Sequence, residues 1–178
     1  MKIFIGCSSK DNIPKKYIDD CNNYLEKLLK DNDLVFGAYH YGLMATCYDI
    51  TKKNNHKVIA VCPKVYAHDL NEMECDQEIL TDNISDRTRE AILNSDALVF
   101  LPGGIGTIYE LFAVLELKRC HEFDKPVVFY NSCGYFDEVL ALFEKMTKEN
   151  FILEEANRLF YVAKDYEDTM KYISNYNK

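Results

Sequence analysis

Short apolar runs alternate with amphipathic helical patterns along this chain of 178 residues, and the alternation constrains its fold more than any other feature. Strands are expected at residues 2–6, 34–36, 57–62, 97–101, 126–130 and 159–162. Helices are expected at residues 12–30, 42–54, 85–94, 107–121, 135–149 and 166–174. The less regular segment 65–82 is expected to form a loop with a short strand.

Strands that alternate with helices form parallel sheets whose two faces are both covered. With 48% hydrophobic and 28% charged residues, a chain of this length can bury a full core without a disulfide or a metal. The sequence therefore predicts an α/β fold: a single nucleotide-binding domain over residues 1–178, with a doubly wound, Rossmann-like parallel sheet and helices on both faces.

Cysteine usage and charge limit where the protein works and what it binds. Its seven cysteines form no CxxC pair and mostly lie within apolar patterns, which predicts reduced core thiols, no zinc site and a cytoplasmic location. Residues 1–7 lack a basic leader, and no apolar run approaches membrane-spanning length, so no membrane association is expected. A net charge of -8 argues against nucleic-acid binding, which requires a basic face.

The stretch 94–111, NSDALVFLPGGIGTIYEL, is typical of a phosphate site. An apolar strand ends at a turn in which Gly104 and Gly106 are expected to allow positive φ and close backbone approach, and Thr107 is expected to cap the helix that follows. The free N–H groups and the dipole of that first helical turn would attract an anion.

Glu110 allows two interpretations. It lies three residues after Thr107, the spacing of a capping box, so it can be a reciprocal cap. It also lies one turn into a helix whose start would hold a phosphate, which places its carboxylate near the attached sugar and predicts a catalytic role.

Two more segments follow predicted strands, at Gly6-Cys7-Ser8-Ser9 and at 37–45, GAYHYGLMA. Together with Pro102-Gly103-Gly104-x-Gly106-Thr107-x-x-Glu110, they resemble the LONELY GUY family, whose hallmark is a PGGxGTxxE motif and whose members were long mislabelled as lysine decarboxylases. The resemblance extends to KPVVFYNSCGYFDEVL at 125–140. Counted back from Ser95-Asp96-Ala97, the family's functional arginine falls on Arg87, or on Arg89 if the register slips.

The resemblance implies hydrolysis of the N-glycosidic bond of a purine nucleoside 5′-monophosphate, of adenine type with or without an N6 modification, to free base and ribose 5-phosphate. Glu110 and Arg87 would be catalytic, with no metal and no organic cofactor, and the protein would be a homodimer. The expected phosphate and nucleotide contacts are Gly103, Gly104, Gly106, Thr107, Ser8, Gly37 and Met44.

Several residues keep a second interpretation. Ser8 can cap its turn, Arg87 can be a surface ion-pair partner, and the Tyr39–Tyr41 segment can stack on a base or form loop and dimer contacts. The chain also departs from the family at Ala38, Tyr39 and Ala45, which replace glycines and predict a tighter pocket, and at Thr88, which replaces a lysine near the expected phosphoribosyl group.

Two other functions are weighed against hydrolysis. A non-catalytic nucleotide or cofactor carrier could use the same phosphate turn. A pyridoxal-phosphate lysine decarboxylase needs a Schiff-base lysine, which the spacing of Lys118 and Lys125 does not support.

Overall fold

Seven parallel strands form one sheet in a computed structural model that describes residues 1–152 and 158–176. The strand order is β4-β3-β2-β1-β5-β6-β7, and every pairing is parallel. The strands are β1 (Lys2–Gly6), β2 (Asp33–Phe36), β3 (Val58–Pro63), β4 (Gln77–Thr81), β5 (Ala97–Phe100), β6 (Val127–Tyr130) and β7 (Tyr161–Ala163). The predicted α/β class with a doubly wound parallel sheet is confirmed.

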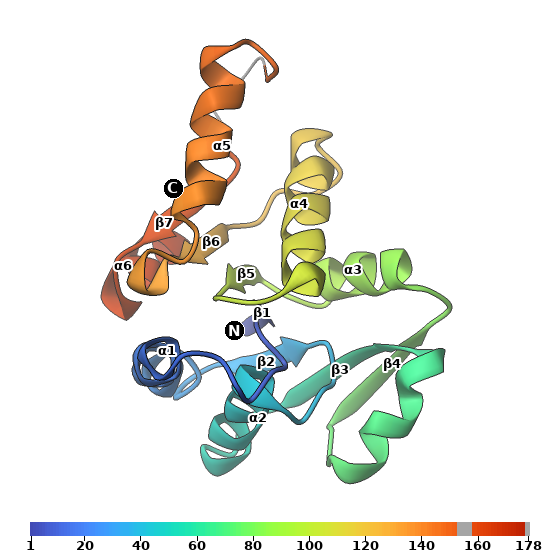
Figure 1. The fold of residues 1–178 in the computed structure, drawn as a ribbon. Coiled ribbons are helices and arrows are strands. Elements are labelled where there is room, and N and C mark those ends of the chain that lie inside the picture. The colour runs from blue at the N-terminus through green and yellow to red at the C-terminus, as the bar shows by residue number, and fades with distance from the viewer. Residues whose placement is uncertain (153–157, 177–178) are drawn as a thin grey trace.

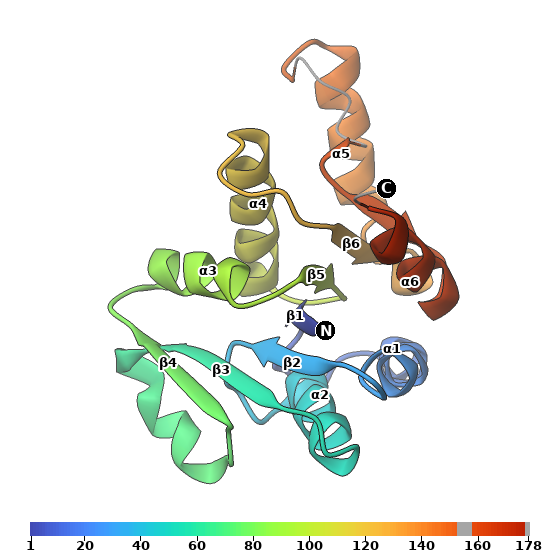
Figure 2. The same cartoon turned by 180° about the vertical axis from the view of Figure 1, so that it is seen from behind.

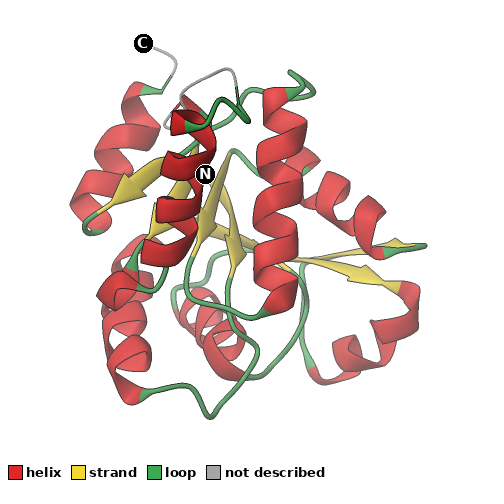
Figure 3. Cartoon of the chain, turned by 45° about the horizontal axis from the view of Figure 1, so that its top comes forward, coloured by secondary structure: helices red, strands yellow, loops and turns green. Residues whose placement is uncertain are grey.

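Helices cover both faces of this sheet (Figures 1, 2 and 3). In the described ranges, the α-helices are α1 (Lys15–Leu28), α2 (Gly42–Lys53), α3 (Ile84–Leu93), α4 (Ile105–Arg119), α5 (Asp137–Lys148) and α6 (Tyr166–Asn175), and the 3-10 helices include η1 (Lys64–Glu72) and η2 (Ser132–Gly134). Along β1, Ile3 and Ile5 face the apolar cluster under α1, α2 and α6, whereas Phe4 faces the cluster under α3, α4 and α5. Both faces of the central strands are therefore buried.

Two predicted elements differ from the structure. The first helix begins at Lys15 with Pro14 as its N-cap, rather than at Asn12. The segment expected to be a loop with a short strand does contain a short strand, the edge strand β4 with exposed Gln77 and Glu78, but the 3-10 helix η1 takes the place of much of the loop. An edge strand with exposed polar residues lacks the apolar pattern that reveals a buried strand.

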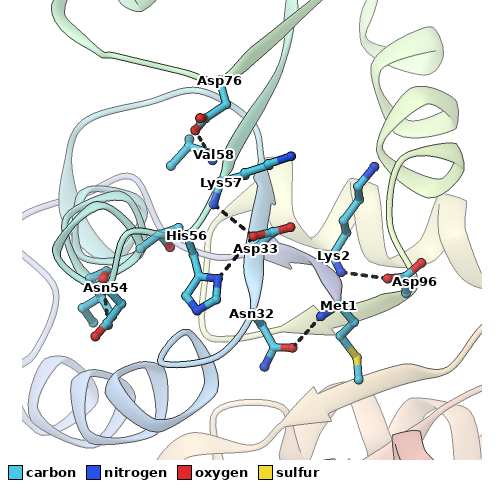
Figure 4. A network of polar contacts seen from close by, with 12 residues as sticks. Met1, Lys2, Asn32, Asp33, Asn54, His56, Lys57, Val58, Asp76 and Asp96 are labelled. Atoms are coloured by element: carbon cyan, nitrogen blue, oxygen red, sulfur yellow. Dashed lines mark hydrogen bonds and ion pairs between the residues drawn. The ribbon is translucent and has the colours of Figure 1, made fainter.

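Polar side chains accept hydrogen bonds from the backbone at the amino edge of the sheet, where the strands begin (Figure 4). The backbone N–H groups of Lys2, Lys57 and Val58 donate to the carboxylates of Asp96, Asp33 and Asp76 at 2.8, 3.0 and 2.8 Å. The α-amino group of Met1 donates to Asn32 Oδ1 at 3.1 Å. The backbone N–H groups and the α-amino group at the start of these strands therefore have hydrogen-bond partners within the protein.

None of the seven cysteines, all of which lie in the described ranges, forms a disulfide; Cys7, Cys21, Cys47 and Cys62 are buried, Cys75 is half-buried, and Cys120 and Cys133 are exposed. Every helix in the described part of the chain is too short or too polar to cross a lipid bilayer.

Candidate active site

The order of the strands reverses between β1 and β5, because the chain moves outward from β1 to β4 and then returns to the other side of β1. In such sheets, ligands bind outside the carboxyl ends of the strands at this switch point. Ser8 N donates to Pro102 O at 3.0 Å, and the Thr107 hydroxyl donates to Cys7 O at 3.0 Å. The loops that follow β1 and β5 are therefore joined directly at the switch point.

The glycine-rich turn starts α4 differently from the prediction. The N-cap is Gly104, with φ of -83° and no side-chain cap, and α4 begins at Ile105. Thr107 lies inside the first turn, so the prediction that it caps the helix is wrong, and the capping-box interpretation of Glu110 fails with it. The first N–H groups of a helix have no partner within it, and the residues that open α4 line the cavity at the switch point.

The glycines in this turn provide space rather than positive φ. Positive φ occurs among described glycines only at Gly42 and Gly134. A Cβ added to Gly103 would lie 2.6 Å from Thr107 Cβ, whereas a Cβ at Gly104 or Gly106 would meet no atom within 4 Å. Gly103 is thus required for packing, and the other two leave the start of α4 open to a ligand.

A cavity of about 330 Å³ lies in front of this turn. Its walls bring together eight of the nine predicted site residues, which are Ser8, Gly37, Met44, Arg87, Gly104, Gly106, Thr107 and Glu110. The ninth, Gly103, lines a neighbouring cavity instead. Segments that are far apart in the sequence, such as those of Ser8 and Glu110, meet here because parallel strands place their carboxyl ends at one edge.

Arg87 and Glu110 form a buried ion pair in this cavity, between Arg87 Nη2 and Glu110 Oε1. The side chain of Arg87 is 17% exposed and that of Glu110 only 4%. Burial raises the pKa of Glu110 to about 7, against the lowering effect of the Arg87 guanidinium. A carboxyl group with this pKa can exchange a proton near neutral pH, which suits acid–base chemistry.

The guanidinium of Arg87 extends from Glu110 toward Gly37, where an added Cβ would lie 3.6 Å from Nη1. Its Nε is buried and has no hydrogen-bond partner among the described residues. An unsatisfied buried donor costs roughly 1–3 kcal/mol. Native proteins carry few of them, and they tend to occur where function requires them.

Two further residues on α3, Thr88 and Arg89, directly follow Arg87 in the sequence, and the structure places both of them. Arg89 pairs with Glu122 at the surface, where their side chains are 59% and 41% exposed, so the predicted position Arg87 lies in the cavity and Arg89 does not. Thr88 is buried and its hydroxyl donates to Ile84 O at 3.3 Å. Thr88 is not among the residues that line the cavity.

Sequence reasoning did not assign Cys7, Lys10 and Tyr66 to the site, although all three line the cavity. Tyr66 belongs to the irregular segment, and Lys10 follows the Ser-Ser pair after β1, so no periodic pattern identifies either one. A hydrogen bond with the Cys47 thiol and burial raise the pKa of Cys7 well above its usual range. This thiol is therefore no ready nucleophile.

Of the other residues that allowed two interpretations, some line the cavity and others lie at the surface. The Ser8 hydroxyl accepts from Lys10 N at 3.1 Å, as expected of a residue that caps its turn, and Ser8 also lines the cavity, so its contact with a ligand stays a prediction. Tyr39 lines the cavity, whereas His40 pairs with Asp49 at 3.1 Å and Tyr41 is 50% exposed. No group of three or more histidine, cysteine, aspartate or glutamate residues in the described ranges is arranged to hold a metal ion.

Comparison with solved structures finds the same fold. The Moco carrier protein from Chlamydomonas reinhardtii is similar with a TM-score of 0.68 and 21% identity, over 97% of this chain and 94% of that one. The molybdenum cofactor binding protein from the phototrophic bacterium Rippkaea orientalis is similar with a TM-score of 0.67 and 18% identity, over the same shares of both chains.

Comparison with protein families and curated sequences is more specific. The family described as "Possible lysine decarboxylase" matches residues 44–173. Cytokinin riboside 5′-monophosphate phosphoribohydrolase LOG4 of Arabidopsis thaliana is 29% identical over 99% of this chain and 83% of its own length. The probable phosphoribohydrolase LOG6 of the same plant is 31% identical over 90% of this chain and 81% of its own length. The motifs, the fold and these matches agree, and the chain belongs to the LONELY GUY family.

Proposed function

We propose that this protein hydrolyses the N-glycosidic bond of a purine nucleoside 5′-monophosphate to free base and ribose 5-phosphate. The observation that carries the proposal is the buried Arg87–Glu110 pair, which lies beside a helix start that is open to a phosphate. The names of the curated relatives support the same reaction class. The cavity of about 330 Å³ is within the size range of small-molecule sites.

The phosphate binds at the start of α4. The first N–H groups of that helix have no partner within it, and open space lies over Gly104 and Gly106. Binding the phosphate there anchors the nucleotide remotely from the bond that breaks, which orients the ribose against Glu110.

Cleavage then proceeds through an oxocarbenium-like ribose. The C1′–N bond breaks, its electron pair leaves with the base nitrogen, and that nitrogen takes up a proton from bulk water, which is restored when Glu110 releases the proton that it accepts from the attacking water. The Glu110 carboxylate stabilises the positive charge on the sugar and accepts a proton from the water that attacks C1′. Arg87 keeps Glu110 ionised and contacts the departing base or the phosphate.

Lysine decarboxylation, which the family description names, does not fit the lysines that the sequence offered for it. Lys118 Nζ donates to Lys125 O at 2.9 Å, and Lys125 Nζ donates to Ile92 O and Ser95 O, both at 2.6 Å. Neither lysine lines the cavity. Both ammonium groups satisfy backbone carbonyls instead.

Homodimer formation is also part of the proposal. Ile105 is 90% exposed at the start of α4, and Ile84 and Tyr109 are 43% and 40% exposed on α3 and α4. Large apolar side chains grouped on adjacent helices are typical of a surface covered by another chain. Sedimentation equilibrium should give twice the chain mass of 20.7 kDa, and Ile105→Glu should give the mass of one chain; a monomeric wild type would refute this part.

The reaction is tested by incubating the purified protein with AMP, GMP, CMP, UMP and an N6-alkylated AMP and following the free base by chromatography. Glu110→Gln and Arg89→Gln are the variants compared with wild type. We expect base release from purine monophosphates by wild type and Arg89→Gln, but not by Glu110→Gln. Binding of AMP without release of base by wild type would instead support a nucleotide carrier.

A further inference from the structure

A second cavity, of about 200 Å³, lies beside the phosphate turn. It shares Ser8, Lys10 and Gly104 with the active-site cavity, but it shares neither Arg87 nor Glu110. The two cavities therefore meet where the nucleotide's phosphate is expected. A chemical group in the second cavity would have to be attached to the ligand through its phosphate, because the residues around the sugar and base do not reach that cavity.

The wall of the second cavity is mostly apolar and aromatic, formed by Ile13, Pro14, Tyr17, Pro102 and Tyr135. The Tyr135 hydroxyl donates to Gly103 O. The ring of Tyr135 packs edge-on against Tyr17 with the ring centroids 5.5 Å apart. The aromatic wall is thus anchored to the phosphate turn itself, and it offers ring surface to a planar or apolar group.

One charged residue, Lys10, lines both cavities. Lys10 lies at their junction, and its backbone is fixed because Lys10 N donates to the Ser8 hydroxyl at 3.1 Å and Gly42 packs closely against it. The second cavity has no acidic residue among the described residues that line it. On a protein with a net charge of -8, this junction is a local site for an anion.

From these contacts we infer that the protein accepts nucleotides whose 5′-phosphate carries a second, planar or apolar group. The nucleoside lies in the active-site cavity, the phosphate bridges Gly104 and Lys10, and the second group lies against Tyr17 and Tyr135. This inference rests on the proposed function and deepens it, since it names the substrate class as phosphate-esterified nucleotides alongside monophosphates.

Three ligands separate the contributions of the two cavities. They are AMP, its phosphate methyl ester and its phosphate phenyl ester, with affinities measured by calorimetry in the Glu110→Gln protein to prevent turnover. The methyl ester controls for the loss of one phosphate charge. Because the ring buries apolar surface in the second cavity, the phenyl ester should bind about tenfold more tightly than the methyl ester.

Two variants locate the ring. Ile13→Trp fills the second cavity and Tyr17→Leu removes one aromatic wall, so each should abolish or reduce the advantage of the phenyl ester and leave AMP affinity unchanged. Lys10→Gln should weaken all three ligands relative to the matched surface variant Lys15→Gln. If either Ile13→Trp or Tyr17→Leu does not fold, the other variant still tests whether the phenyl ring binds in the second cavity.

Equal affinity for the two esters, or a phenyl advantage that persists in both Ile13→Trp and Tyr17→Leu, would overturn the inference. If wild type still releases adenine from AMP in that case, the proposed function stands and only the second cavity is misassigned. If AMP neither binds nor is hydrolysed, both proposals fail together.

Discussion

At the amino edge of the sheet, side-chain carboxylates accept hydrogen bonds from the backbone groups that begin the strands, whereas at the carboxyl edge the first turn of α4 opens onto a cavity. Asp33, Asp76 and Asp96 supply three of the acceptors at the amino edge. At the other edge the one buried acid in the cavity, Glu110, pairs with Arg87 and not with the backbone.

This difference separates stability from function. Both edges carry carboxylates close to strand ends, but among the described residues it is the carboxyl edge that combines a buried ion pair with room for a ligand at the start of a helix. Substitutions of residues that line the active-site cavity should therefore reduce turnover or ligand binding. Substitutions of residues that pack or bond the backbone, which are Gly103 and the aspartates of the amino edge, should instead reduce the free energy of unfolding. The predictions below test this separation.

Replacing Glu110 should have the largest effect. Glu110→Gln keeps the size of the side chain and can still accept from Arg87, but it cannot carry the negative charge or accept a proton. We expect kcat to fall about 10³-fold, as for loss of a general base, while AMP affinity stays within about threefold. Steady-state kinetics and calorimetry measure the two quantities; a kcat within tenfold of wild type would remove Glu110 from the mechanism.

Arg87 and Arg89 form a matched pair on one helix. Arg87→Gln removes the charge that faces Glu110 in the cavity, and kcat/KM should fall about 10²-fold. Arg89→Gln disrupts only an exposed ion pair with Glu122, so kcat/KM should stay within about twofold and the free energy of unfolding within about 0.5 kcal/mol. Equal losses in the two variants would contradict the distinction between them.

Neighbouring glycines provide a second matched pair. Gly103→Ala forces a methyl group against Thr107 and should lower the free energy of unfolding by about 2 kcal/mol. Gly104→Ala places its methyl in open space, so stability should be retained, but AMP should bind about tenfold more weakly because the methyl occupies the approach of the phosphate. Urea unfolding and calorimetry test both; unchanged AMP affinity in Gly104→Ala would move the phosphate away from this turn.

The sequence predicts a site residue when that residue belongs to a periodic pattern or to a motif. The α/β fold and the switch-point turn with Glu110 follow from alternation and from one motif with its spacing, whereas the position of Arg87 comes from the resemblance to the LONELY GUY family. The capping role given to Thr107 failed because a threonine before a helical pattern does not show whether the helix starts one turn earlier. Lys10 and Tyr66 were not found because their segments are irregular, and only tertiary structure brings them to the cavity.

A substitution at the amino edge should reduce the stability of the protein and leave its turnover unchanged. Asp33 Oδ1 accepts from Lys57 N at 3.0 Å and faces His56 Nδ1 at 3.4 Å. Asp33→Ala should therefore lower the free energy of unfolding by about 1 to 2 kcal/mol, while kcat/KM stays within about twofold. A large loss of turnover in a variant that remains folded at the assay temperature would break the separation of the two edges.

The most direct test of the account is the pH dependence of kcat/KM for release of base, compared in wild type, Arg87→Gln and Arg89→Gln. Burial raises the pKa of Glu110 to about 7, and the proposed reaction uses its carboxylate form, so kcat/KM should rise with pH through about 7 and then level off. Loss of the Arg87 charge should move this rise to higher pH, whereas Arg89→Gln should leave it in place. Ionisation of the substrate phosphate is the same in all three proteins and cannot produce a difference between them. A rise at the same pH in wild type and Arg87→Gln would contradict the claim that this buried pair performs the reaction.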